Sequence, residues 1–142
     1  MTTDRGHVTR VPILLRYRDI DTLGHLNQSL YHTFLEEART AIVMDLLGDG
    51  RAAEDVGFVL ARVELDHRRE IVLADREVFA ESWVQQVGTS SLRLGARIVK
   101  GDGTVAAEGV TILVGWDPER RGARELGADE RERLLAAMGT GS

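Results

Sequence analysis

One segment constrains the fold of this chain more than any other: a single long helical repeat set among segments that alternate like strands. From residue 28 to about residue 47, apolar side chains recur every three to four positions, which places them on one face of an α-helix. Gly48, Asp49 and Gly50 follow and are typical of a helix end. Because the apolar stripe is broad, we predict that most of one side of this helix is buried.

Alternation with period two predicts the strands on either side of the helix. One strand is expected before it, at residues 11–17, and four after it, at residues 58–66, 78–87, 92–98 and 104–116. Residues 88–89 and 100–103 are predicted turns, and residues 128–138 a short terminal helix. This order predicts an α+β fold, in which an antiparallel five-stranded sheet packs against one dominant helix.

Length and composition exclude several classes of protein. The 142 residues fit a single domain, 1–142, with a core at about 10–116, an extension at 117–142, and loose tails at 1–7 and 139–142. The absence of cysteine excludes disulfides, thiolate metal sites and a cysteine nucleophile. A net charge of -5 argues against nucleic-acid binding. No secretory signal or membrane-spanning run is visible, so we expect a cytoplasmic protein that does not bind membranes.

The strand at residues 78–87 predicts an oligomer. It carries Val78, Ala80 and Val84 on one face and Phe79 and Trp83 on the other. Since one helix covers only one face of a sheet, we expect a second copy of the chain to cover the other.

The loop at residues 18–27 concentrates polar functional groups between a strand and the long helix. The first N–H groups of a helix lack partners and form a positive pole, which can polarise a carbonyl and hold an oxyanion. A nearby carboxylate, Asp19 or Asp21, could attack that carbonyl or activate a water. The alternatives are that both aspartates are solvated turn residues, or that they bind a metal together with His25. A third strong metal ligand is not convincingly placed, so we expect no metal.

Residues 16–39 read R-Y-R-D-I-D-T-L-G-H-L-N-Q-S-L-Y-H-T-F-L-E-E-A-R. This motif closely resembles the signature of the 4-hydroxybenzoyl-CoA thioesterase-like family of hotdog-fold acyl-CoA thioesterases, approximately [R/F]-Y-x-D-x-D-x-x-G-H-[V/L]-N-N-x-x-Y with a helix ending in E-x-A-R. The resemblance covers roughly residues 10–116. It implies a hotdog fold, a sheet wrapped around one long helix, and a homodimer or dimer of dimers (a homotetramer) with active sites at the dimer interface.

The resemblance also implies roles for individual residues. Asp21 matches the catalytic carboxylate, and the N–H groups at the helix start would hold the oxyanion. The implied substrate-binding residues are Gly24, His25, Asn27, Tyr31, Arg68, Arg69, Ser90 and Ser91. Arg68 and Arg69 could meet the phosphates of coenzyme A, although in a chain with a single lysine, Lys100, an arginine pair also fits a solvated strand end.

Three positions depart from the family pattern. Gln28 stands for the second asparagine of the motif, His67 stands for a tyrosine, and a proline is missing from residues 68–71. These departures leave Asp21 unchanged and affect the expected contacts with the nucleotide and acyl parts of the substrate.

We therefore predict an acyl-CoA thioesterase that needs no cofactor beyond the coenzyme A of its substrate. Asp21 would act as nucleophile or as general base. The alternatives are a thioesterase for acyl carrier protein, a hotdog dehydratase, and a non-catalytic protein that binds acyl thioesters. A net charge of -5 weighs mildly against docking an acidic carrier protein.

Overall fold

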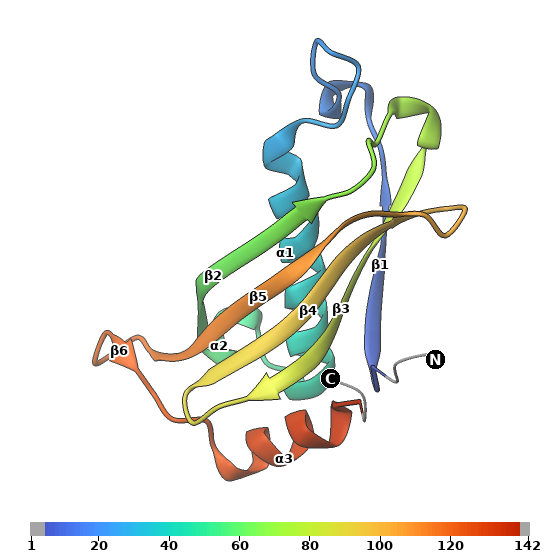
Figure 1. The fold of residues 1–142 in the computed structure, drawn as a ribbon. Helices are drawn as coiled ribbons and strands as arrows, with labels where there is room; N and C mark the ends of the chain where they lie inside the picture. Colours follow the sequence, from blue (N-terminus) through green and yellow to red (C-terminus); the bar gives the residue numbers. More distant parts are fainter. Residues whose placement is uncertain (1–4, 140–142) are drawn as a thin grey trace.

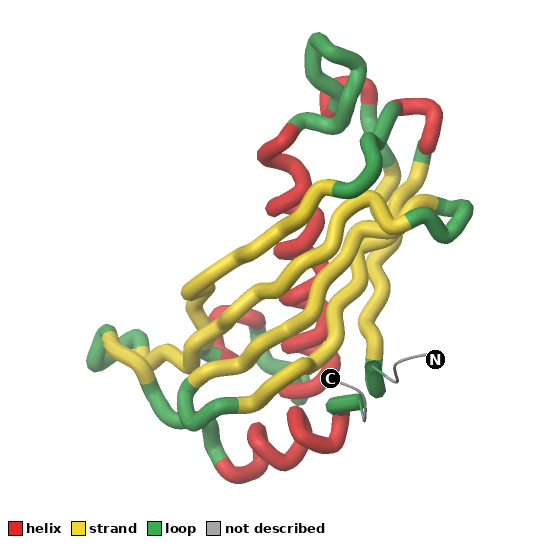
Figure 2. The backbone as a smooth tube through the Cα atoms, viewed as in Figure 1, coloured by secondary structure: helices red, strands yellow, loops and turns green. Residues whose placement is uncertain are grey.

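The computed structural model describes residues 5–139; most of the two predicted tails, residues 1–4 and 140–142, lie outside the described residues. The strands are β1 (Val8–Leu14), β2 (Phe58–His67), β3 (Glu77–Val87), β4 (Ser91–Lys100), β5 (Val105–Asp117) and β6 (Gly122–Ala123) (Figure 1). The α-helices are α1 (Gln28–Leu47), α2 (Ala53–Val56) and α3 (Ala128–Ala137) (Figure 2). Two 3₁₀ turns, Tyr17–Asp19 and Leu73–Asp75, connect them.

The strands form one antiparallel sheet in the order β1-β3-β4-β5-β2, which curls around α1 (Figure 1). This architecture confirms the predicted α+β fold with one long helix. The short strand β6, which pairs with the end of β5, was not predicted from the sequence.

The core lies between α1 and the concave face of the sheet. The helix packs against β1, β3 and β4 and buries one continuous face. Burying a large apolar side chain contributes roughly 1.5–3 kcal/mol, so this face accounts for much of the stability of the fold. The buried residues of α1 are Tyr31, Phe34, Leu35, Ala38, Ile42, Val43 and Leu47.

The outer face of β3 is covered by arginines of the same chain. Trp83 lies flat over Gly95, where any Cβ would come within 2.3 Å of the indole ring. The guanidinium carbons of Arg5 and Arg97 lie 4.6 and 5.7 Å from that ring. Trp83 is therefore only 9% exposed in the single chain. Its burial requires no second copy, so the oligomer predicted from this strand stays a prediction.

Two sequence-based boundaries were wrong. The first strand is Val8–Leu14 rather than residues 11–17, because its pairing with β3 extends back to Trp83. Residues 5–7, expected in a loose tail, lie beside the C-terminal helix. His7 N donates to Ala137 O at 3.0 Å, and Gly6 forms a bridge with Met138. Within residues 5–139, no helix has the length and apolar character needed to cross a membrane.

Candidate active site

Asp21 lies exposed in a tight loop that closes on itself before α1. Ile20 and Leu26 form an isolated antiparallel bridge, and Asp21 N donates to His25 O at 2.8 Å. Gly24 turns the loop with a φ of +85°, a conformation that L side chains rarely adopt. The loop is therefore a compact turn whose backbone is fixed at both ends.

The loop also orients the Asp21 carboxylate. Its Oδ1 accepts hydrogen bonds from Leu23 N at 2.9 Å and from His25 N at 3.2 Å. Within residues 5–139, Oδ2 has no hydrogen-bond partner. One oxygen is thus fixed by the backbone, and the other faces solvent.

Asn27 caps the start of α1, as its residue type predicts. Its side-chain oxygen accepts from Ser29 N at 3.1 Å and from the Ser29 hydroxyl at 3.0 Å. Within the described chain, the N–H of Gln28 has no hydrogen-bond partner. The helix therefore presents a free backbone donor a few residues after Asp21.

Asp19 has the opposite surroundings to Asp21. It is 2% exposed, and Arg16 donates to its carboxylate from the backbone N–H at 2.9 Å and from the guanidinium at 3.0 Å. Burial alone would raise the pKa of Asp19, but the hydrogen bonds and charge of Arg16 outweigh it and hold that pKa below its usual value. Asp19 is therefore a structural carboxylate of the loop.

The segment that follows β2 packs against the loop through Glu70 and Ile71, two residues to which the sequence analysis gave no role. His25 Nε2 lies 2.7 Å from Glu70 Oε2, and Leu26 N donates to Ile71 O at 2.8 Å. The sequence held one signal for this packing, because Gln28 and His67 both depart from the family pattern. In the structure their side chains contact each other at 3.2 Å.

His67 also connects the segment to the core. Its ring packs edge-on against Tyr31, with 4.5 Å between the ring centroids. Tyr31 is 4% exposed, and burial raises the pKa of its hydroxyl. The structure thus brings Asp21, Gly24, His25, Asn27 and Tyr31 together at one end of the molecule.

Arg68 and Arg69 lie beside this group, at the end of β2. With His67, Thr104 and Val105 they line an open hollow of about 480 Å³. Arg68 pairs with Glu108 at 2.6 Å, while the guanidinium of Arg69, among the residues that the structure describes, donates only to the carbonyl of Arg68. The hollow therefore keeps cationic donors available.

Ser90 and Ser91 are not brought to Asp21 within one chain. They lie at the turn between β3 and β4, at the end of the sheet next to α3, whereas the Asp21 loop lies at the other end (Figure 1). Gly115 N donates to Ser90 O at 2.8 Å and Gly115 pairs with Phe58, so β5 lies between the two serines and the start of β2.

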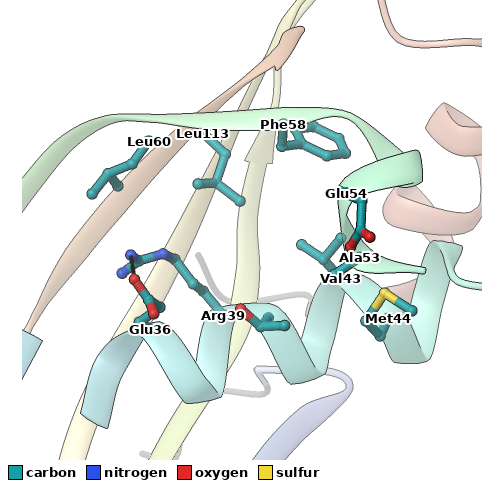
Figure 3. Close-up of a pocket in the computed structure, with 10 residues that line it drawn as sticks. Glu36, Arg39, Val43, Met44, Ala53, Glu54, Phe58, Leu60 and Leu113 are labelled. Carbon is teal, nitrogen blue, oxygen red and sulfur yellow. Dashed lines mark hydrogen bonds and ion pairs between the residues drawn. The ribbon is translucent and has the colours of Figure 1, made fainter. Parts of the chain in front are cut away.

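A half-open groove of about 360 Å³ lies between the second half of α1 and the start of β2. Figure 3 shows Phe58, Leu60 and Leu113 of the sheet on one side, and Arg39, Val43 and Met44 of α1 on the other. Arg39 pairs with Glu36 at 3.3 Å, and desolvation lowers the pKa of its guanidinium. Apolar side chains line the middle of the groove, with Glu36 and Arg39 at one end and Glu54 at the other (Figure 3).

The described residues contain no group of three or more histidine and carboxylate side chains that could hold a metal ion. Asp19 turns inward to Arg16, and His25 turns to Glu70. The three candidate ligands Asp19, Asp21 and His25 therefore do not converge.

Comparison with known proteins gives a consistent result. Residues 15–137 match the thioesterase-like superfamily. The long-chain acyl-CoA thioesterase FadM of Escherichia coli (strain K12) is 27% identical over 123 residues, which cover 86% of this chain and 93% of FadM.

Solved structures agree. A thioesterase from Thermus thermophilus, complexed with coenzyme A and Zn, has a TM-score of 0.80 and 34% identity, covering 90% of this chain and 92% of its own. A DHNA-CoA thioesterase from Staphylococcus aureus has a TM-score of 0.78, and the match covers 90% of this chain and 89% of that protein. Because the two sequences are only 19% identical, this similarity shows the fold alone.

Proposed function

This chain belongs to the thioesterase-like superfamily, and from that premise we propose that it hydrolyses acyl-CoA thioesters with Asp21 as its catalytic carboxylate. The observation that carries the proposal is the Asp21 loop. One carboxylate oxygen is fixed by two backbone N–H groups, the other is free, and the capped start of α1 follows within a few residues.

In the proposed reaction, the thioester carbonyl lies against the start of α1. The free N–H of Gln28 and the positive pole of the helix stabilise the oxyanion that forms there. Asp21 Oδ2 either attacks the carbonyl carbon or takes a proton from an attacking water. In the first route, a mixed anhydride forms, coenzyme A leaves as the thiol, and water then hydrolyses the anhydride. The second route gives the same free acid and thiol in one hydrolysis.

The two ends of the substrate have separate candidate sites. The hollow lined by Arg68 and Arg69 suits the phosphates of coenzyme A, because arginine donors recognise phosphate well. The groove between α1 and β2 suits the acyl group. Within one chain the groove begins at Glu36, about 12 Å along the helix from Gln28 at 1.5 Å per residue, so it is separated from the oxyanion donor of the same chain.

We include a homodimer in the proposal. Strand β2 is the last strand of the sheet and is ten residues long, with an exposed leucine, Leu60. Such edges tend to pair with another strand. Two antiparallel β2 strands related by a twofold axis would set Phe58 of one chain opposite His67 of the other. The groove and the Ser90–Ser91 turn of one protomer would then lie near the Asp21 loop of its partner.

The proposal also retains a cytoplasmic location and no cofactor beyond coenzyme A.

The test is a thiol-release assay over acyl-CoA substrates of graded chain length and with aromatic acyl groups. Asp21→Asn should lower turnover by about 10²–10⁴-fold if Asp21 is the general base. Asp102→Asn is the matched control, because Asp102 also accepts a loop N–H, from Thr104 at 2.9 Å. Near-normal turnover in Asp21→Asn would refute the assignment.

An absence of thiol release with all acyl-CoA substrates would have a different meaning. The same assay with an acyl thioester of acyl carrier protein would then test the alternative carrier. Binding without release on either carrier would favour a non-catalytic thioester-binding protein.

A further inference from the structure

We propose that Glu70 is a positioning residue for this reaction: it holds the Asp21 carboxylate in place through His25. The inference rests on the proposed role of Asp21. It concerns a residue outside the loop motif, in the segment where the chain departs from the family pattern at His67 and at the missing proline.

The first step is the contact between His25 and Asp21. The backbone of His25 bonds Asp21 on two sides, accepting from Asp21 N at 2.8 Å and donating to Asp21 Oδ1 at 3.2 Å. Any movement of His25 therefore changes both the backbone and the carboxylate of Asp21. Apart from the two chain neighbours of Gly24, no atom of the described residues lies within 4 Å of a Cβ position there, so packing at that residue does not restrain the loop.

The second step is the restraint on His25. Its only side-chain partner within residues 5–139 is Glu70, at 2.7 Å from Nε2 to Oε2. Beside this contact, Leu26 N donates to the carbonyl of Ile71 at 2.8 Å. The loop is thus attached to residues 70–71 by one side-chain contact and one backbone hydrogen bond.

The third step is that residues 70–71 are themselves well anchored. Ile71 is fully buried in the core, and the N–H groups of Arg68 and Arg69 both donate to Ala106 O, at 2.8 and 3.0 Å. Glu70 therefore connects a fixed part of the core to the exposed loop. At 2.7 Å the imidazole of His25 and the carboxylate of Glu70 are in direct contact, so Glu70 limits where His25 can move.

The His25–Glu70 pair has little effect on folding itself. The two side chains are 49% and 63% exposed, and exposed ion pairs contribute little to global stability. We therefore expect loss of Glu70 to change the geometry of the reacting carboxylate while the fold is retained. A misplacement of about 1 Å can lower turnover by about 10²-fold.

The kinetic test compares Glu70→Ala with wild type on the best acyl-CoA substrate. We expect kcat to fall by about 10- to 100-fold with little change in KM. Glu70→Gln, which keeps an acceptor oxygen, should recover part of the loss. Asp129→Asn is the matched control, because it breaks an exposed ion pair with Arg133 at the far end of the molecule. Coinciding thermal unfolding curves would show that all variants fold.

A double-mutant comparison tests the route through His25. In a His25→Ala background, Glu70→Ala should have no further effect on kcat. If Glu70→Ala lowers kcat by the same factor in the wild-type and His25→Ala backgrounds, the proposal is overturned. A wild-type kcat in the single variant Glu70→Ala would also overturn it. If Asp21→Asn remains active, the proposed function fails; if Asp21→Asn is inactive while Glu70→Ala is normal, only this inference fails.

A second measurement does not depend on activity. In two-dimensional NMR spectra, the amide signals of Asp21, Leu23 and His25 should shift in Glu70→Ala and stay in place in Asp129→Asn. Unchanged loop signals in Glu70→Ala would overturn the proposal even if His25→Ala were too slow to assay.

Discussion

Asp19 and Asp21 stand two residues apart and have opposite surroundings. The 3₁₀ turn at Tyr17–Asp19 directs the Asp19 carboxylate inward to Arg16, whereas Asp21 follows the bridge residue Ile20 and is exposed. Burial suits a carboxylate whose partners are fixed, whereas a reacting carboxylate must be accessible to substrate. The loop therefore divides a structural role and a proposed chemical role between two identical side chains.

We predict that Asp19→Asn destabilises the protein by about 1–3 kcal/mol near neutral pH, because it weakens charge-assisted hydrogen bonds to Arg16. The pKa of Asp19 is lower in the folded protein than its usual value of 3.8. The carboxylate therefore stabilises the fold above the unfolded pKa, and this contribution is lost as pH falls through the folded pKa. Urea unfolding across this range should show the difference from wild type shrinking in acid.

Glu77→Gln is the control for Asp19→Asn. Glu77 is exposed at the start of β3, away from the proposed β2 interface, and its side chain has no partner in the part of the chain that the structure describes. It should leave stability nearly unchanged at every pH. A difference between Asp19→Asn and wild type that stays constant into acid would contradict the structural role of the Asp19 charge.

Some residues of the candidate site could be predicted from the sequence, and others could not. Asn27 could be predicted as the helix cap because capping is local chemistry. Glu70 could not, because it meets His25 across 45 positions and nothing in its neighbourhood indicates that contact. The contact between Gln28 and His67 was visible only as two departures from a pattern, without any sign that they touch.

At the scale of elements, α1 was predicted with its observed bounds, because its apolar repeat and its Gly-Asp-Gly ending are both local signals. Strand β1 was misplaced by three residues because pairing with β3 decides its ends. The short elements α2 and β6 were missed, since four and two residues are too few for a period to appear.

Beside contacts made by two arginines of its own, helix α3 is attached to the rest of the chain by Arg124. Its guanidinium pairs with both oxygens of Glu130, at 2.8 and 3.1 Å, and donates to the carbonyl of Val56 at 2.8 Å. Burial raises the pKa of Glu130, but the hydrogen bonds from Arg124 and Gly127 outweigh it, so the net pKa lies below the usual value of 4.5. The charged pair therefore stabilises the docked helix above that value and less as pH falls through the folded pKa.

We predict that Arg124→Met keeps the fold but loosens α3, at a cost of about 1–3 kcal/mol. Hydrogen–deuterium exchange, corrected for intrinsic rates, should rise at the amides of Leu134 and Ala137. Arg120→Met is the control, since Arg120 pairs with Asp117 on an exposed surface. Wild-type exchange in Arg124→Met would contradict this role and show that apolar packing and the contacts of Arg131 and Arg133 hold the helix without Arg124.

At the scale of the whole molecule, one chain separates groups that a thioesterase needs together. The Asp21 loop and the Ser90–Ser91 turn lie at opposite ends of the sheet (Figure 1). The arginine hollow lies at the end of β2, and the groove lies at its start. The free edge of β2 runs between these ends. Sheet order could not be predicted from strand periods, so neither this edge nor the groove beside it was visible in the sequence.

If two β2 strands pair as proposed, each active site combines the Asp21 loop of one protomer with the groove of its partner, and complementation between variants can test this. Asp21→Asn removes the carboxylate, and Thr40→Trp fills the groove from an exposed position on α1. We expect each homodimer to be inactive, whereas the mixed dimer contains one site with a normal Asp21 and a normal groove. Random mixing should restore about a quarter of the wild-type sites.

The same experiment distinguishes a shared site from a site within one chain. If the Asp21 loop and groove of one chain act together, each chain of the mixed dimer carries a defect, and no activity returns. Differently tagged chains allow the mixed dimer to be purified, and its turnover should then reach about half that of wild type. Leu60→Trp, which fills the groove from β2, should complement Asp21→Asn in the same way if the groove rather than the helix surface binds the acyl group.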